Sequence, residues 1–164
     1  MNQALLVIGT QSLLSFIAFG LIARWHVVPW LSKPSLEDRL LALTWPHVFR
    51  YVALTGFLPG QVSPDIPAHA LDAVVYGDTI SALLALVAVV MLRFHAPGAI
   101  AMAWIFNIVG FLDWAQSQVV GMSAQAFSYP TGASAIVYAF YVPLLVVTHV
   151  VMLYWLFTHR RRGN

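Results

Sequence analysis

The sequence predicts an all-α integral membrane protein, a bundle of five transmembrane helices that forms a single domain over residues 1–164. Two features of the composition indicate this fold class. Hydrophobic residues make up 60% of the chain and charged residues 9%, whereas soluble domains carry about 25% charged residues. The mean hydropathy is +0.80. The third observation is that the apolar residues form five runs, each close to the ~20 residues that a helix needs to cross a bilayer.

Segments rich in proline and glycine separate the five runs, and such segments interrupt helices. The first run is not preceded by Lys or Arg, so it is no ordinary secretory signal peptide, and we interpret it as a retained helix. Pro97-Gly98 separates the third run from the fourth, and Pro130-Thr131-Gly132 separates the fourth from the fifth. We expect the spans at residues 4–23, 40–58, 71–92, 100–121 and 135–157.

The second run is the least regular, because it contains Pro46, His47 and Arg50. Ser35, followed three residues later by Asp38, resembles a capping box that begins a helix. Pro46 predicts a kink in that helix. The preferred interpretation is one long kinked helix. The alternative is a short interfacial helix before a span of only ~13 residues, which would require a thinned bilayer.

The basic residues test the number and direction of the spans, because cytoplasmic loops are enriched in Lys and Arg. With five spans, all basic residues except Arg50 fall on one side of the membrane. This pattern predicts an outer N-terminus, a cytoplasmic C-terminus and a multi-pass protein of a cell membrane. The residues on the cytoplasmic side are Arg24, Lys33, Arg39, Arg93, Arg160, Arg161 and Arg162.

Several functions are excluded or unsupported. The chain has no cysteine, which excludes disulfides, thiolate metal sites and iron–sulfur clusters. It has no HExxH, GxSxG or glycine-rich phosphate loop, so nothing supports zinc proteolysis, elbow-type esterase chemistry or nucleotide use. The basic residues are too scattered to form a nucleic-acid site. No metal or other cofactor is predicted, apart from the haem alternative below.

Ionisable and amide side chains inside the spans are the candidate functional residues, because each such charge costs roughly 3 kcal/mol or more in hydrocarbon. At ~1.5 Å of rise per residue, Arg50, Asp78 and Asp113 lie roughly 10–12 Å below the outer edge of the membrane. His47 lies roughly 16 Å below that edge, and Asn107 and His149 lie roughly 12 Å from the cytoplasmic edge. The candidate site residues are His47, Arg50, Asp78, Asn107, Asp113, His149 and, on the same helix face as His149, Tyr138.

One cation and two carboxylates therefore reach the same depth, and a single guanidinium cannot neutralise both acids. We expect the surplus aspartate to stay protonated or to find a second cation, such as protonated His47. The leading hypothesis is a polar site, open toward the outer side, that binds a small or amphiphilic ligand or relays protons. Arg50 would hold an anionic headgroup or tune the acids. A purely structural ion pair that fixes helix register is the competing interpretation.

Three other functions stay open. A carboxylic acid and a histidine at one depth could catalyse acid–base chemistry on a lipid or isoprenoid-like substrate. His47 and His149 could be the axial ligands of a b-type haem. The small residues Gly9 and Ser12 of the first span could form an interface in an oligomer or with a partner subunit of a membrane complex.

The residues Trp45-Pro46-His47, Gly77-Asp78, Asn107 and Asp113 carry one resemblance. In this stretch the chain resembles small uncharacterised integral membrane proteins of bacteria. The resemblance covers about half of the chain, implies location in a bacterial inner membrane, and implies no activity and no residue roles.

Overall fold

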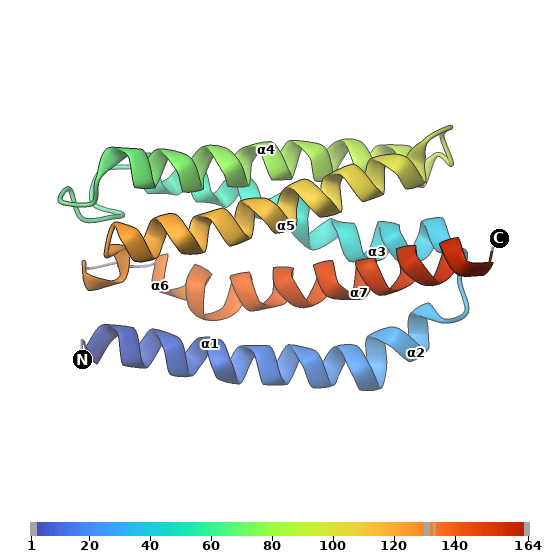
Figure 1. Ribbon diagram of the computed structural model, residues 1–164, viewed down its shortest axis with the longest axis horizontal. Helices are drawn as coiled ribbons and strands as arrows, with labels where there is room; N and C mark the ends of the chain where they lie inside the picture. The colour runs from blue at the N-terminus through green and yellow to red at the C-terminus, as the bar shows by residue number, and fades with distance from the viewer. Residues whose placement is uncertain (1–2, 130–131, 133, 163–164) are drawn as a thin grey trace.

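The computed structural model describes residues 3–129, 132 and 134–162, and within these it contains helices and turns but no strands. The all-α prediction is therefore confirmed. The chain passes along the long axis of an elongated bundle five times (Figure 1). The first pass is α1 (Gln3–Ile22), the π-helix η1 (Ala23–Val27) and α2 (Val28–Leu31); the second is α3 (Leu36–Val48) and the 3₁₀-helix η2 (Phe49–Phe57); the third is α4 (Ala68–Arg93); the fourth is α5 (Ala99–Ser123), followed by the short 3₁₀-helix η3 (Ala126–Ser128); the fifth is α6 (Ser134–Ile136), the π-helix η4 (Val137–Tyr141) and α7 (Val142–Arg162).

The two ends of the bundle differ in charge. We call the end where α1 begins the N-terminal end and the end where α7 finishes the C-terminal end (Figure 1). The segments that carry all Lys and Arg residues except Arg50 lie toward the C-terminal end. The loops that the sequence analysis placed on one side because they contain Lys or Arg therefore lie at one end of the folded bundle.

Four of the five passes are long and apolar enough to cross a membrane: residues 3–31, 68–93, 99–123 and 134–159. Each extends beyond its predicted span by one or more residues at both ends, because the helices continue past the apolar core. The second pass is not among the four. It is not one regular helix of sufficient length, since it changes from α to 3₁₀ geometry after Val48.

A kink was expected at Pro46, and the irregularity found there is this change from α-helix to 3₁₀-helix. Pro46 lies inside α3 and cannot donate a backbone hydrogen bond, and the 3₁₀-helix begins three residues later, at Phe49. A 3₁₀-helix rises about 2.0 Å per residue against about 1.5 Å in an α-helix. The 22 residues from Leu36 to Phe57 therefore extend roughly 37 Å, more than the ~30 Å of a bilayer core.

Two further prolines coincide with π-helical turns that the sequence did not predict. Pro29 follows η1 by two residues, and Pro143 follows η4 by two residues. A proline leaves the carbonyl four residues earlier without a donor and clashes with it, and widening the preceding turn relieves both problems. The widened turn η4 carries Tyr138 and Tyr141, so the backbone irregularity lies directly beside the polar cavity described below.

The core depends on the close packing of α4 against its neighbours. Ser81, Ala82, Ala85 and Ala88 are buried on one face of α4, and a stripe of such small residues allows helices to approach closely. Toward the C-terminal end, larger apolar side chains fill the interior. These include Leu40, Leu92, Phe106, Met152 and Leu156.

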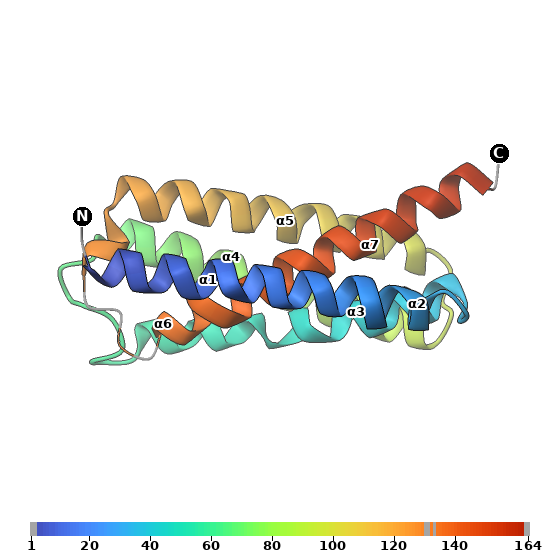
Figure 2. The same cartoon turned by 90° about the horizontal axis from the view of Figure 1, so that it is seen from below.

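The helix α1 is peripheral. Ile8 is its buried residue, and most of its large apolar side chains are exposed. Figure 2 shows α1 running along the outside of the bundle. Its contacts with the fifth pass include the hydrogen bond from Ser12 Oγ to Tyr138 O, 3.1 Å, and the packing of the Phe19 ring on Phe140.

Candidate functional site

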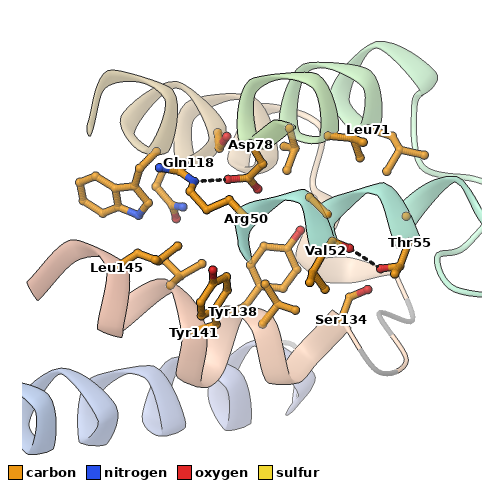
Figure 3. A pocket seen from close by; sticks show the side chains of 18 of the residues that line it. Arg50, Val52, Thr55, Leu71, Asp78, Gln118, Ser134, Tyr138, Tyr141 and Leu145 are labelled. Atoms are coloured by element: carbon orange, nitrogen blue, oxygen red, sulfur yellow. Dashed lines mark hydrogen bonds and ion pairs between the residues drawn. The ribbon is translucent and has the colours of Figure 1, made fainter. Parts of the chain in front are cut away.

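Arg50 is the centre of the site, and it is 3% exposed although it carries a full charge. Its guanidinium reaches two neighbouring helices. Nε donates to Asp78 Oδ1 at 2.7 Å, as Figure 3 shows, and Nη2 donates to Asp113 Oδ2 at 2.5 Å. Nη1 donates to the Gly110 carbonyl oxygen at 3.1 Å. The predicted meeting of the arginine with the two aspartates is therefore confirmed.

Glycines make this close approach possible. A Cβ atom at Gly77 on α4 would overlap the Asp113 carboxylate, and one at Gly110 on α5 would lie 3.0 Å from Arg50 Nη1. Ser81, four residues after Gly77, donates from its hydroxyl to Asp113 Oδ2 at 3.3 Å. Gly77 is not among the residues predicted for the site. The spacing Gly77-x-x-x-Ser81, which is typical of close helix contacts in membranes, could have indicated it.

His149 adjoins the arginine. Its Nε2 is 3.5 Å from Arg50 Nη1, and its backbone oxygen accepts a hydrogen bond of 3.4 Å from Asn107 Nδ2. The depth estimates located backbone positions only, and a long arginine side chain reaches a residue whose backbone lies at another level. Asn107 and His149 therefore join the site through side-chain contacts.

His47 packs beside His149, with ring centroids 4.1 Å apart, and its Nε2 is 2.9 Å from Thr148 Oγ1. Phe106 contacts both imidazoles. His47 makes no hydrogen bond to Asp78 or Asp113, so the structure does not bring it to the carboxylates as their second cation. The two rings touch directly, which leaves no iron site between them, so this geometry offers nothing in support of the haem hypothesis.

A cavity of about 90 Å³ lies beside the Arg50–Asp78 pair, between η2, α4, α5 and the fifth pass. We call it the polar cavity. Figure 3 shows Tyr138 and Tyr141 projecting from the fifth pass toward this pair. The Tyr141 hydroxyl donates to the Pro46 carbonyl oxygen at 2.6 Å. Further lining residues include Thr55, Leu71, Gln118, Ser134, Leu145 and His149.

The two aspartates have different environments. The Asp78 side chain lines the polar cavity and is 22% exposed, whereas Asp113 does not line it and is 10% exposed. Among the described residues that line the cavity, Arg50 is the sole Lys or Arg. Arg50, Asp78 and Asp113 together therefore carry a net charge of −1 (+1 − 2) when all three are ionised.

All seven candidate residues thus belong to one continuous cluster. Arg50, Asp78 and Asp113 form its ionic centre, Tyr138 lines the cavity next to it, and His149, His47 and Asn107 continue it toward the C-terminal half. The contacts that sequence analysis did not identify are those of Thr148 with His47 and of Gln118 with the cavity. Neither residue is charged, so neither is unusual in a membrane span.

Comparisons with known proteins identify one family. A family model described as a domain of unknown function (DUF8737) matches residues 7–157, which include parts of all five passes and every residue of the cluster. Comparison with curated proteins and with solved structures found no match. Because the family match covers nearly the whole chain, the chain belongs to the DUF8737 family.

Proposed function

We propose that the chain is a five-span membrane protein whose polar cavity binds, from the outer side, a small ligand that brings a positive charge to Asp78. The four apolar helices and the length of the second pass support membrane insertion. The concentration of Lys and Arg at the C-terminal end supports a cytoplasmic location for that end and an outer location for the N-terminal end. The polar cavity then lies in the outer half of the bilayer.

The observation that carries this proposal is the charge of the cluster. Arg50 already donates to two carboxylates and to a backbone carbonyl, so an added anion would meet a site with an excess of negative charge. A cation or a proton would instead neutralise the surplus carboxylate. Since Asp78 is the carboxylate that lines the cavity, a positively charged group in the cavity can pair with it directly.

Three probes of equal size test the proposal: n-butylammonium, n-butanol and butyrate. Their binding would be measured by calorimetry on the purified chain in lipid nanodiscs. We expect only the ammonium to bind, and Asp78→Asn to weaken it about 10- to 100-fold, the range of a hydrogen bond to a charged group. Asp72→Asn, on the exposed face of α4, is the matched control and should have no effect. Equal binding of butanol, or full binding by Asp78→Asn, would contradict the proposal.

Proton relay is a second candidate, favoured by the histidine pair. His149 and His47, which are both buried, connect the ionic centre to the Thr148 hydroxyl, which lies 2.9 Å from His47 Nε2. Nδ1 of both histidines and Oδ1 of Asn107 are buried without a hydrogen-bond partner among the described residues, as expected where ordered water fills gaps. Proton flux into liposomes loaded with a pH-sensitive dye would test this candidate. Flux that is unchanged by His149→Gln would exclude the relay.

A further inference from the structure

A groove lies on the lipid-facing side of the bundle between α1, α5 and the fifth pass, with a volume of about 500 Å³. We call it the lateral groove. It lies in the part of the bundle near the N-terminal end. Its walls are mainly apolar, from Leu5, Ile8 and Phe16 on α1 and Met122 on α5. Its shape and lining are those of a site for an alkyl chain rather than for a polar solute.

The lateral groove adjoins the polar cavity across a shared wall. Four residues line both spaces: Trp114 and Gln118 on α5, and Tyr138 and Val142 on the fifth pass. A molecule whose chain lies in the groove therefore has its polar end separated from Asp78 only by these side chains.

The shared wall also holds an unused hydrogen-bond donor. Trp114 Nε1 is buried and has no hydrogen-bond partner among the residues that the structure describes. An indole N–H is only a donor, so it needs an acceptor such as a hydroxyl or carbonyl oxygen. Buried polar groups without a partner are rare in folded proteins, and a bound ligand or water is the usual explanation.

We infer that the ligand is a single-chain amphiphile with a basic head group, which enters from the membrane between α1 and α5. Its alkyl chain lies in the lateral groove, its amine pairs with Asp78 in the polar cavity, and an oxygen next to the amine accepts from Trp114 Nε1. This inference rests on the proposed function for the position of the amine. It adds the class of ligand and the route by which the ligand enters.

The loose attachment of α1 suits lateral entry. A Cβ atom at Gly9, which lines the groove, would meet no atom within 4 Å, so an alkyl chain has room against α1 at this position. The hydrogen bond from Ser12 Oγ to Tyr138 O ties α1 to the shared wall. Most large apolar side chains of α1 are exposed, so its surface can contact an alkyl chain that enters from the membrane.

Photolabelling tests the inference. The probe is dodecylamine with a photoreactive diazirine in the middle of its chain, and the matched probe is the corresponding dodecanol, which reports unspecific partition into lipid. Both are applied to the full chain in nanodiscs, and labelled residues are located by mass spectrometry. We expect the amine to label the α1 and α5 residues of the lateral groove more strongly than the alcohol, which cannot form an ion pair with Asp78, and excess n-butylammonium to suppress this difference.

Variants of α1 provide the control. Gly9→Leu places a side chain in the lateral groove and should lower groove labelling about tenfold, which corresponds to a steric cost of about 1.4 kcal/mol. Gly20→Leu is the matched variant, because a Cβ atom there also meets no atom within 4 Å but the residue lines a different groove, against α7. It should leave the label unchanged.

The results separate the inference from the proposed function. If n-butylammonium binds and requires Asp78, but the long amine labels all lipid-facing helices alike, the cavity binds a cation and lateral entry is wrong. If the long amine labels the groove and Asp78→Asn leaves this label intact, the groove binds chains without help from the carboxylate, and the inferred ligand class is wrong. Equal effects of Gly9→Leu and Gly20→Leu would also overturn the inference.

Discussion

Because the site has two carboxylates and one guanidinium, we expect replacement of Arg50 to destabilise the protein more than replacement of either aspartate. Arg50→Gln removes the sole cation that contacts Asp78 and Asp113 in the described part of the chain, and it leaves both acids in a site where Arg50 itself is 3% exposed. Removing one partner of a buried ion pair costs about 3–5 kcal/mol, because the remaining charge has no compensation. Asp78→Asn or Asp113→Asn instead leaves one cation and one anion, and the new amide oxygen can still accept from the guanidinium. We expect each aspartate variant to change stability by about 1 kcal/mol or less.

The free energy of unfolding would be measured for the wild type and the three single variants by denaturant titration in mixed micelles. The double variant Arg50→Gln/Asp113→Asn is the control, because it removes one of the stranded carboxylates. It should recover part of the loss caused by Arg50→Gln alone. Losses of equal size in Arg50→Gln and both aspartate variants would refute the reasoning. Equal losses would mean that the guanidinium needs both carboxylates, so that no negative charge is left to pair with a cationic ligand.

Two further predictions concern orientation and packing. Because the chain has no cysteine, Ser63→Cys and Ser35→Cys each introduce a single thiol that can be labelled. In intact cells, a membrane-impermeant maleimide should react with Ser63→Cys and not with Ser35→Cys. The reverse pattern would show that the proposed orientation is inverted. Gly110→Ala should destabilise the chain by about 1–3 kcal/mol, because its Cβ would lie 2.9 Å from His149 Cε1. Gly9→Ala is the control: its Cβ meets no atom within 4 Å, so the free energy of unfolding should change by less than about 0.5 kcal/mol. Thermal unfolding in detergent would compare the two, and similar melting temperatures would show that the site tolerates a wider helix separation.

The helical architecture could be predicted because a bilayer imposes simple requirements. Backbone groups in hydrocarbon must be paired within the chain, so an apolar run of sufficient length predicts a helix. The same cost of exposed polarity predicted that Arg50 would meet Asp78 and Asp113, since each of them alone would be too expensive in lipid. Their contacts at 2.7 and 2.5 Å follow from this requirement.

The irregular helices could not be predicted in the same way. The sequence has prolines at positions 29, 46 and 143, but only the packing around each decides how the backbone responds. Two give π-helical turns, and one precedes a 3₁₀-helix. His149 lies 3.5 Å from Arg50 Nη1, a contact that the long arginine side chain makes. A constant rise per residue locates backbone atoms only and cannot predict such a contact.

The sequence by itself determined which ionised groups lie deep within its apolar runs, namely Arg50, Asp78 and Asp113, and that the loops between these runs alternate between having and lacking Lys and Arg. Only the tertiary structure decided that Asp78 faces the polar cavity while Asp113 lies against Gly77 and Ser81. The physical reason is that composition and span length follow from transfer into the bilayer, residue by residue. The rotation of a helix about its axis, in contrast, depends on side chains from helices far apart in the sequence.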